Sequence, residues 1–376
     1  MVNPGNGTDG ALTVGNTTFN MHTMATSPRT CADAVMHRVA SLADNNVTLS
    51  TTPAGGCLAT GDEVLLINQQ GHYGGMGLRI ANVGTYELLR VDTVNGAMVT
   101  FTSNKTRFYG NVVDSDLFTG TEQKVFLQRV PNYSAVSVAT GGVLTGNTWS
   151  ATGGGVLFFR SQGSVVVDGA IDMDGKGYGG GNSPAFQGQS GNQGESRAGV
   201  IASSNANLGG RGAGYGGTLC LSTTSYPGGG GAMAGPGGVG VLMDCPQLAS
   251  VSYADFPTRL YLGSGGGGGA STVTGALPGG AGGRGGGAVI IHAGSINVSG
   301  QVRARGGAGL SPANMAGCPA CQTVAAPGGG GAGGTVVLVS GATLGTGDVS
   351  GGSGGTVCAP CSEPGGIGGQ GQLLVR

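Results

Sequence analysis

Two aspartates, Asp172 and Asp174, come nearest to a chemical site in this sequence of 376 residues. They stand two residues apart in the segment VVVDGAIDMDGKG, where Asp168 supplies a third carboxylate. Alternate residues of a strand face the same side, about 6.5–7 Å apart along the chain. Carboxylates at that spacing could bind Ca²⁺ or form the acid/base pair of a sugar-cleaving β-helix enzyme. The third interpretation, which we favour, is a solvated strand edge beside a glycine corner.

The later repeats of the sequence do not extend this pair into a row of carboxylates. Asn297 and Ser299 stand in the roughly equivalent strand of a second repeat, and Gly345 and Gly347 in that of a third. We therefore expect no catalytic residue and no cofactor, with calcium at the aspartate pair as the alternative.

Eight cysteines form four pairs along the chain, and two of the pairs are CxxC motifs. An even, paired count in a chain with few lysines fits an oxidising compartment, so we expect disulfides and a secreted or cell-surface protein. The CxxC motifs are too far apart for the usual zinc site, and no βαβ context supports a redox role. Each CxxC pair either closes on itself or links one turn to the next. The pairs are Cys31/Cys57, Cys220/Cys245, Cys318/Cys321 and Cys358/Cys361.

Arginine and aromatic side chains carry the binding signal of the sequence. They gather in irregular excursions within its glycine-rich half, and tyrosine and arginine are typical anchors of exposed binding surfaces. The alternative is that they fill gaps over a bundle that is poor in side chains. The candidates are Arg211, Tyr215, Tyr226, Tyr253, Phe256, Arg259 and Tyr261.

Composition excludes several classes of function. Charged residues make up 9% of the chain and the net charge is −1, which leaves no basic footprint for nucleic acid. No apolar run approaches the roughly 20 residues of a membrane-spanning helix, and the nucleophile-elbow, HExxH and Walker patterns are missing. The opening residues MVNPGNGTDG lack the features of a signal peptide, so we expect that one has been removed.

The distribution of glycine along the chain predicts the structural elements that must position these residues. The chain has 84 glycines, crowded into residues 151–376. Stretches that begin at Gly153, Gly285 and Ala332 each run from glycines through a β-branched strand and further short strands back to glycines, and a shortened fourth, GGQGQLLVR, follows. A period of this length is typical of stacked supersecondary units, because a unit so short cannot bury its own apolar face.

Two arrangements fit residues 151–376, and we expect them to coexist. The strands would stack as a parallel β-solenoid, with glycine at corners that need positive φ. The glycine runs would form polyglycine II helices, which can pair their amides with neighbours because they lack side chains.

The N-terminal half reads as a separate all-β domain over residues 11–150, after a flexible arm at 1–10. Asn95-Gly96 between two alternating strands predicts a tight hairpin. Residues 30–42 fit a weak helical pattern, although residues 39–42 fit a strand equally well. The expected strands are 11–20, 47–51, 63–68, 84–94, 98–102, 124–130 and 135–138.

Several runs resemble the glycine-rich exported surface proteins of myxobacteria and related bacteria, over most of residues 60–376. They include GDEVLLINQQG, VGTYELLRVDTVNGAMVTFTSNKTRFYG and GGAGGRGGGAVIIHAGSINVSGQVRARGGAG. A looser likeness joins the glycine runs to phage tail-fibre tip adhesins, whose polyglycine II bundles display receptor-binding loops. Both resemblances imply display or attachment rather than catalysis.

These observations favour a non-enzymatic, exported structural or surface-display protein, either an adhesin or a filament subunit. The expected partner is a cell-surface or glycan ligand, or a second copy joined head to tail through terminal strands such as QLLVR. We expect no nucleic-acid partner and no membrane span. The alternative is a carbohydrate-active β-helix enzyme that uses Asp172 and Asp174.

Overall fold

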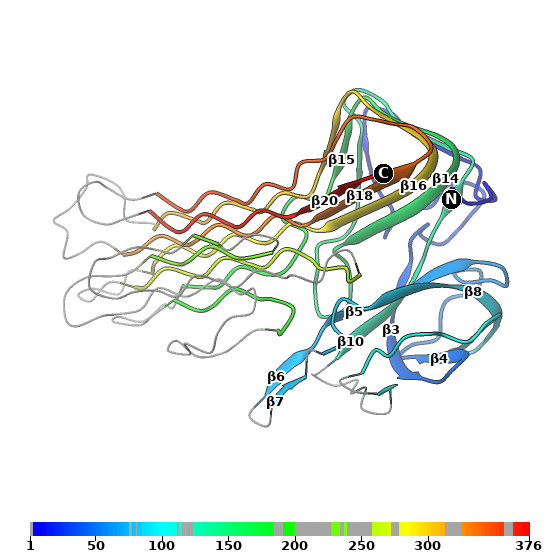
Figure 1. Ribbon diagram of the computed structural model, residues 1–376, viewed down its shortest axis with the longest axis horizontal. Helices are drawn as coiled ribbons and strands as arrows, with labels where there is room; N and C mark the ends of the chain where they lie inside the picture. The colour runs from blue at the N-terminus through cyan, green and yellow to red at the C-terminus, as the bar shows by residue number, and fades with distance from the viewer. Residues whose placement is uncertain are drawn as a thin grey trace.

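The computed structural model is all-β, as the sequence predicts: every regular element of the described residues is a strand. The described residues are 3–74, 77–79, 81–110, 113–114, 117, 123–183, 191–199, 227–233, 237–238, 258–271, 278–312, 325–356 and 364–376. They form a parallel solenoid, an antiparallel barrel and a bundle of glycine segments (Figure 1).

The solenoid is built from two parallel sheets, a larger and a smaller one, to which successive turns of the chain add strands. The larger sheet has the order β1-β12-β14-β16-β18-β20, with β11 (Asn132–Tyr133) and β19 (Thr343–Leu344) attached to β14 and β16. Its six ordered strands are Ala11–Val14, Ala135–Val138, Val156–Val167, Ala288–Val298, Thr335–Ser340 and Gln372–Val375. The smaller sheet, β17-β15-β13-β2, contains Gln301–Arg303, Ala170–Asp172, Val143–Thr145 and Thr18–Asn20.

The core of the solenoid is made of apolar side chains that stack turn on turn. Leu157 lies opposite Val289, which lies opposite Val336, and none of the three is exposed. A parallel strand buried on both faces needs a near-continuous apolar run, and the runs that begin the three repeats supply it. The predicted solenoid is therefore confirmed, with the repeats in the predicted register at the start of each strand.

The barrel is an insertion into the first turn of the solenoid. Its order is β10-β3-β4-β9-β8-β5, and it closes on itself. One outer face, with Ile67 and Phe126, packs on Phe158 and Ile290 of the larger solenoid sheet. Its strands are Lys124–Arg129, Met36–Leu42, Asn46–Leu49, Met98–Phe101, Tyr86–Asn95 and Glu63–Gln70, and a small hairpin joins β6 (His72–Gly74) to β7 (Gly77–Arg79).

This topology corrects the expected domain organisation. The sheets do not divide at residue 150, because β1, β2, β12 and β13 belong to the solenoid. Only the stretch from β3 to β10, residues 36–129, forms the barrel. The composition changes at residue 150 because the glycine segments begin there, whereas the solenoid begins at β1.

Residues 3–10 are not a free arm, which corrects the second expectation for this region. The Asp9 carboxylate accepts hydrogen bonds from Arg129 Nη2 at 2.6 Å and from the Asn132 amide at 2.7 Å. The carbonyl of Asn3 accepts a hydrogen bond from Arg160. The segment is held because it supplies acceptors to two arginines that are themselves buried.

Two local predictions have different outcomes. The helical pattern over residues 30–42 is wrong, because Met36–Leu42 is strand β3 and pairs with both β10 and β4. Barrel pairing overrides a weak helical period at this position. The hairpin at Asn95-Gly96 is confirmed: it joins β8 to β9, and Gly96 has φ of +59°.

The glycine bundle consists of extended segments that run out from the solenoid and return to it (Figure 1). The amide of Gly266 donates to the carbonyl of Gly283, Gly283 to Gly329, and Gly329 to Gly267, at 2.8–2.9 Å. Three segments thus bond to one another in a closed triangle, which a flat sheet does not allow. The bundle comprises residues 177–183, 191–196, 228–233, 263–271, 278–287, 304–311, 325–334, 348–356 and 364–371.

Close approach of the backbones explains why the bundle needs glycine. A Cβ at Gly266 would overlap the carbonyl of Gly329, and one at Gly283 would overlap the carbonyl of Gly307. In the described bundle segments the glycine content is therefore a packing requirement.

Candidate functional site: a charged ladder on the solenoid

Asp172 and Asp174 lie on the outer side of the smaller solenoid sheet, where the next turns bring up charged residues. Asp172 ends β15 and lies opposite Arg303, which ends β17. Arg303 in turn bridges to Asp348 on the following turn. We call Asp172, Asp174, Arg303, Arg305 and Asp348 the charged ladder.

Ion pairs connect the members of the charged ladder. Arg303 Nη2 lies 2.7 Å from Asp172 Oδ2, and Arg303 Nε lies 3.1 Å from Asp174 Oδ2 without the direction of a hydrogen bond. Arg305 binds the same carboxylate with Nη2 at 2.7 Å and with Nε at 2.9 Å. Arg305 Nη1 lies 3.8 Å from Asp348, a looser contact. Both sequence-predicted aspartates are therefore engaged by arginines.

The ladder favours its charged forms. Partial burial acts to raise the pKa of Asp172, but the hydrogen bonds from Arg303 and from the Asp174 amide hold that pKa below its usual value. The hydrogen bonds to Asp172 and Asp174 raise the pKa of Arg303 and of Arg305 respectively. Opposite charges stabilise each other's ionised state, so Asp172, Arg303 and Arg305 are charged at neutral pH.

The expected equivalence between the repeats is wrong at this sheet. Asn297 lies opposite Val166 in the larger sheet rather than level with Asp172. Asn297 belongs to β16, the partner of β14, whereas Asp172 belongs to β15, the partner of β17; the register shift of β14 between Ser161 and Ser164 moves the pairing by a single residue and does not account for the difference. One feature of the sequence could have revealed the correct partners. DMDG, which contains Asp172 and Asp174, and RARGG, which contains Arg303 and Arg305, each stand directly before a glycine segment.

A shallow groove of about 170 Å³ runs beside the ladder, between β17 and the following turn. Gln301, Arg303, Thr346 and Asp348 supply its polar groups. In the described ranges no three His, Cys, Asp or Glu side chains come together as a metal site. A cation at the aspartate pair would have to compete with two guanidinium groups, and calcium at Asp172 and Asp174 stays the alternative expectation.

The structure describes two of the candidate binding residues: Tyr261 is buried, and Arg259 is half-buried. Tyr261 is 1% exposed; its hydroxyl accepts a hydrogen bond from Arg197 at 2.9 Å, and Arg197 stacks on its ring. Arg259 donates to the carbonyls of Ala81 and Val83. For Tyr261 the exposed-anchor interpretation is corrected, and the gap-filling alternative applies. Arg211, Tyr215, Tyr226, Tyr253 and Phe256 lie outside the described residues.

One of the predicted disulfides lies within the described residues. Cys31 and Cys57 are bonded, with their Cα atoms 5.1 Å apart, and they tie the segment before β3 to the segment before β5. The other predicted disulfide residues, Cys220, Cys245, Cys318, Cys321, Cys358 and Cys361, lie outside the described residues.

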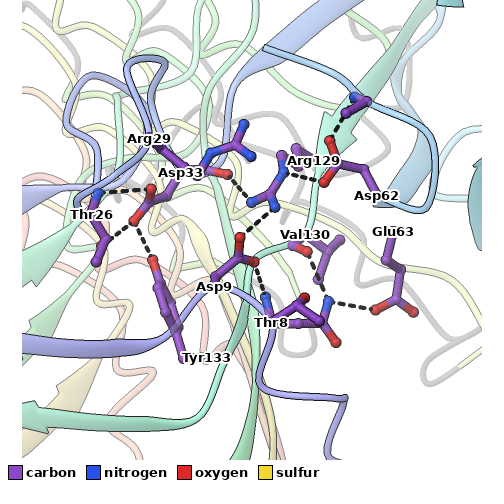
Figure 2. A network of polar contacts seen from close by, with 12 residues as sticks. Thr8, Asp9, Thr26, Arg29, Asp33, Asp62, Glu63, Arg129, Val130 and Tyr133 are labelled. Carbon is purple, nitrogen blue, oxygen red and sulfur yellow. Dashed lines mark hydrogen bonds and ion pairs between the residues drawn. The ribbon is translucent and has the colours of Figure 1, made fainter. Parts of the chain in front are cut away.

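A buried polar network, which sequence reasoning missed, joins the barrel to the solenoid (Figure 2). Arg129 of the barrel, 4% exposed, binds Asp9 at 2.6 Å and Asp62 at 2.8 Å and also donates to the Asp33 carbonyl. The Asp33 carboxylate accepts from the Tyr133 hydroxyl at 2.7 Å. Burial, with the nearby charge of Asp33, raises the pKa of Tyr133. This network is structural, since its polar groups are paired with one another.

Comparison with known proteins gives limited information. No protein-family model and no curated protein matches the chain, so the myxobacterial resemblance stays an expectation. Within the described ranges no helix is long and apolar enough to cross a membrane.

Three solved tailspikes match part of the chain, and it spans about a quarter of their lengths or less. The Pseudomonas phage phi297 tailspike gp61 is 19% identical over 43% of this chain and 24% of its own, with a TM-score of 0.18. The tailspike gp49 of Pseudomonas phage LKA1 is 16% identical over 45% of this chain and 26% of its own, with a TM-score of 0.19. The tailspike gp54 of Acinetobacter baumannii bacteriophage AP22 was solved in complex with a capsular saccharide. It is 12% identical over 36% of this chain and 21% of its own, with a TM-score of 0.19. TM-scores this low identify neither a shared activity nor a shared ligand.

Proposed function

We propose that this chain is a non-enzymatic, exported surface-display protein whose glycine bundle presents connecting segments for attachment to a cell-surface glycan. The observation that carries the proposal is the common level at which the bundle segments turn back. We call this level the far end. There Asn192 bonds to Asn182, Ala326 to Ala270, and Gly365 to Gly355, at 2.9–3.0 Å.

Four connections between outgoing and returning segments leave from the far end. Residues 184–190, 272–277, 313–324 and 357–363 each join two segments that are hydrogen-bonded to the bundle there. The opposite end of the bundle continues into solenoid strands, for example from Gly287 into β16. A bundle anchored on a sheet at one end and carrying connections at the other is suited to display.

We also propose that the bundle segments are polyglycine II helices. Triangular hydrogen bonding among neighbours and the overlap that any Cβ would create both support this conformation. Such a bundle is stiff without an apolar core, because its backbone amides are satisfied by neighbouring segments.

The ladder supports a non-enzymatic role. A general acid in sugar cleavage needs a raised pKa, whereas the pKa of Asp172 is lowered and Asp174 is held by two arginines. The rival proposal remains a carbohydrate-active enzyme. Turnover on a polysaccharide panel that is abolished by Asp172→Asn would establish that rival.

The display proposal is tested by replacing the connections at the far end. Segments 184–190 and 272–277, which contain no cysteine, are exchanged together for glycine–serine sequences of equal length. We expect binding of labelled protein to encapsulated bacterial cells and to a glycan array to fall at least tenfold, while the β circular-dichroism spectrum is retained. Arg305→Gln, which leaves the far end intact, is the control. Unchanged binding after the exchange would refute the role of these segments.

A second candidate, a filament subunit, rests on the two outer strands of the larger solenoid sheet. Leu373 and Val375 of β20 are each 40% exposed, and β1 is the outer strand at the other side. Because Gln372 and Arg376 donate toward β18, the alternate amides of Leu373 and Val375 face away from it. Negative-stain microscopy of wild type and Leu373→Pro decides the matter. Fibres that the proline abolishes would support assembly, and dispersed wild-type particles at high concentration would exclude it.

A further inference from the structure

A cleft of about 380 Å³ lies where the barrel meets the solenoid, separate from both the charged ladder and the far end of the bundle. We call it the junction cleft. One wall is the beginning of the barrel, with Val35 and Met36, and the other is the turn between β13 and β14. Its polar side chains come from His22, Asn147, Thr148, Ser150 and Thr152. Pockets of this size at the junction of two structural units are typical ligand sites.

The junction cleft has no charged group in its lining. Its one titratable side chain, His22, has its pKa lowered to about 4 by burial, so the ring is neutral at physiological pH. His22 Nδ1 accepts from the Asn147 amide at 2.8 Å, and Nε2 consequently donates to the Val156 carbonyl at 2.9 Å. The ring is fixed in one tautomer and forms a rigid part of the wall. Two cations stand close to this lining without being part of it: Lys176 acts on His22, and Arg38 donates to the Ala151 carbonyl.

The solenoid wall of the cleft is a tight turn that holds two hydroxyl groups together. Ser150 and Gly153 exchange backbone hydrogen bonds at 3.1 Å, and Ser150 Oγ lies 2.9 Å from Thr152 Oγ1. Gly153 has φ of +121°, and a Cβ there would stand 2.7 Å from Met36 Sδ. The turn therefore requires glycine at position 153. It places the two hydroxyls in the same cleft lining as the apolar side chain of Met36.

The amide and the remaining groups add donors and acceptors in fixed positions. Asn147 Oδ1 accepts from Asn20 Nδ2 at 2.8 Å, which orients its amide nitrogen as a donor. Behind the wall, Gln69 Oε1 and Gln128 Oε1 are buried and without a hydrogen-bond partner among the described residues. Neither glutamine belongs to the cleft lining, so only the lining groups themselves indicate a ligand.

We propose that the junction cleft binds an uncharged sugar residue. Hydroxyl and amide groups on one side and Val35 with Met36 on the other match the two chemistries of a pyranose, its hydroxyls and its C–H face. A polyol can add hydrogen bonds to the Asn147 amide nitrogen and to the Thr148 hydroxyl, which an apolar ligand cannot, and the lining offers an acidic sugar no charged partner. The proposal does not depend on the far end of the bundle, so it can fail while the display function stands.

The test uses the full chain labelled with ¹³C at its methionine methyl groups. Methyl glycosides of glucose, galactose, mannose and N-acetylglucosamine are titrated separately, with glucuronic acid as the charged comparison. We expect saturable movement of the Met36 signal, assigned through Met36→Leu, with at least one neutral glycoside. The signal of Met98, 42% exposed and in the barrel strand β9, should stay still.

Two isosteric variants and a matched control complete the test. Thr152→Val and Thr148→Val each remove one hydroxyl from the cleft, and we expect each to weaken binding at least fivefold. Thr13→Val makes the same change at an exposed position of β1 and should leave binding unchanged. No saturable movement with any neutral glycoside, equal binding of glucuronic acid, or full binding by both cleft variants would overturn the proposal.

Discussion

Arg303 lies directly opposite Asp172 in the parallel pairing of β17 with β15, and its guanidinium reaches the Asp172 carboxylate at 2.7 Å. The two residues are 131 positions apart in the sequence. The same arginine also faces Asp174, and Asp348 follows on the next turn. Asp172, which the sequence offers as a calcium ligand or an acid/base group, thus forms a cross-strand ion pair with Arg303, and such pairs stabilise the pairing of solenoid turns.

The contribution of this ion pair to stability should disappear in acid. The pKa of Asp172 in the folded chain is below its value in the unfolded chain, about 3.9. A depressed carboxyl pKa stabilises the fold above the unfolded value, and this stability is lost as the pH falls through the folded value. We expect Asp172→Asn to lower the free energy of unfolding at pH 7 but to match wild type near pH 2. Urea titrations at both pH values measure this, and a difference that grew in acid would contradict it.

Removing Arg129 should destabilise the chain far more than removing Arg303. Arg129→Met leaves the carboxylates of Asp9 and Asp62 buried and unpaired, which costs about 3–5 kcal/mol. Arg303 is a quarter exposed, so Arg303→Met should lower the free energy of unfolding by about 1 kcal/mol or less. Chemical denaturation compares the two variants.

A compensated variant makes the Arg129 prediction specific. Adding Asp9→Asn and Asp62→Asn to Arg129→Met removes the stranded charges seen in Figure 2 and should recover part of the lost stability. No recovery would mean that packing, rather than charge pairing, accounts for the effect.

A methyl group should be harmful in the glycine bundle and harmless at an open glycine. Gly266→Ala forces a Cβ against the Gly329 carbonyl and should cost about 1–3 kcal/mol, with faster amide hydrogen exchange in the bundle. Gly55, whose surroundings leave room for a Cβ, should accept alanine with little change or a gain of about 0.4–1 kcal/mol. Equal tolerance at both positions would refute the close-packed bundle.

All eight cysteines should be oxidised in the purified protein. The structure contains Cys31–Cys57, whose partners are 26 residues apart, and a loop of that length is worth about 3 kcal/mol. Intact-mass measurement after alkylation under denaturing, non-reducing conditions should find no free thiol. Any alkylated cysteine, or stoichiometric zinc in the native protein, would count against the disulfide interpretation. Reduction is expected to loosen the glycine-rich half more than the barrel, because the barrel buries more apolar side chains.

The sequence alone determined the features that depend on neighbouring residues. The all-β class, the Asn95-Gly96 hairpin and the repeats that become β14, β16 and β18 follow from alternation, turn chemistry and runs of β-branched residues. The Cys31–Cys57 bond also follows, because both cysteines flank a short excursion.

Only the tertiary structure decided which distant residues share a level of the solenoid. Nothing local shows that β1 and β2 belong to the solenoid while residues 36–129 form an inserted barrel. Nor does local pattern show that Asp172 meets Arg303, because alignment of the repeats does not reveal that Asp172 belongs to β15, the partner of β17. Parallel stacking joins residues more than a hundred positions apart, and its register is set by packing and irregularities summed over the whole turn.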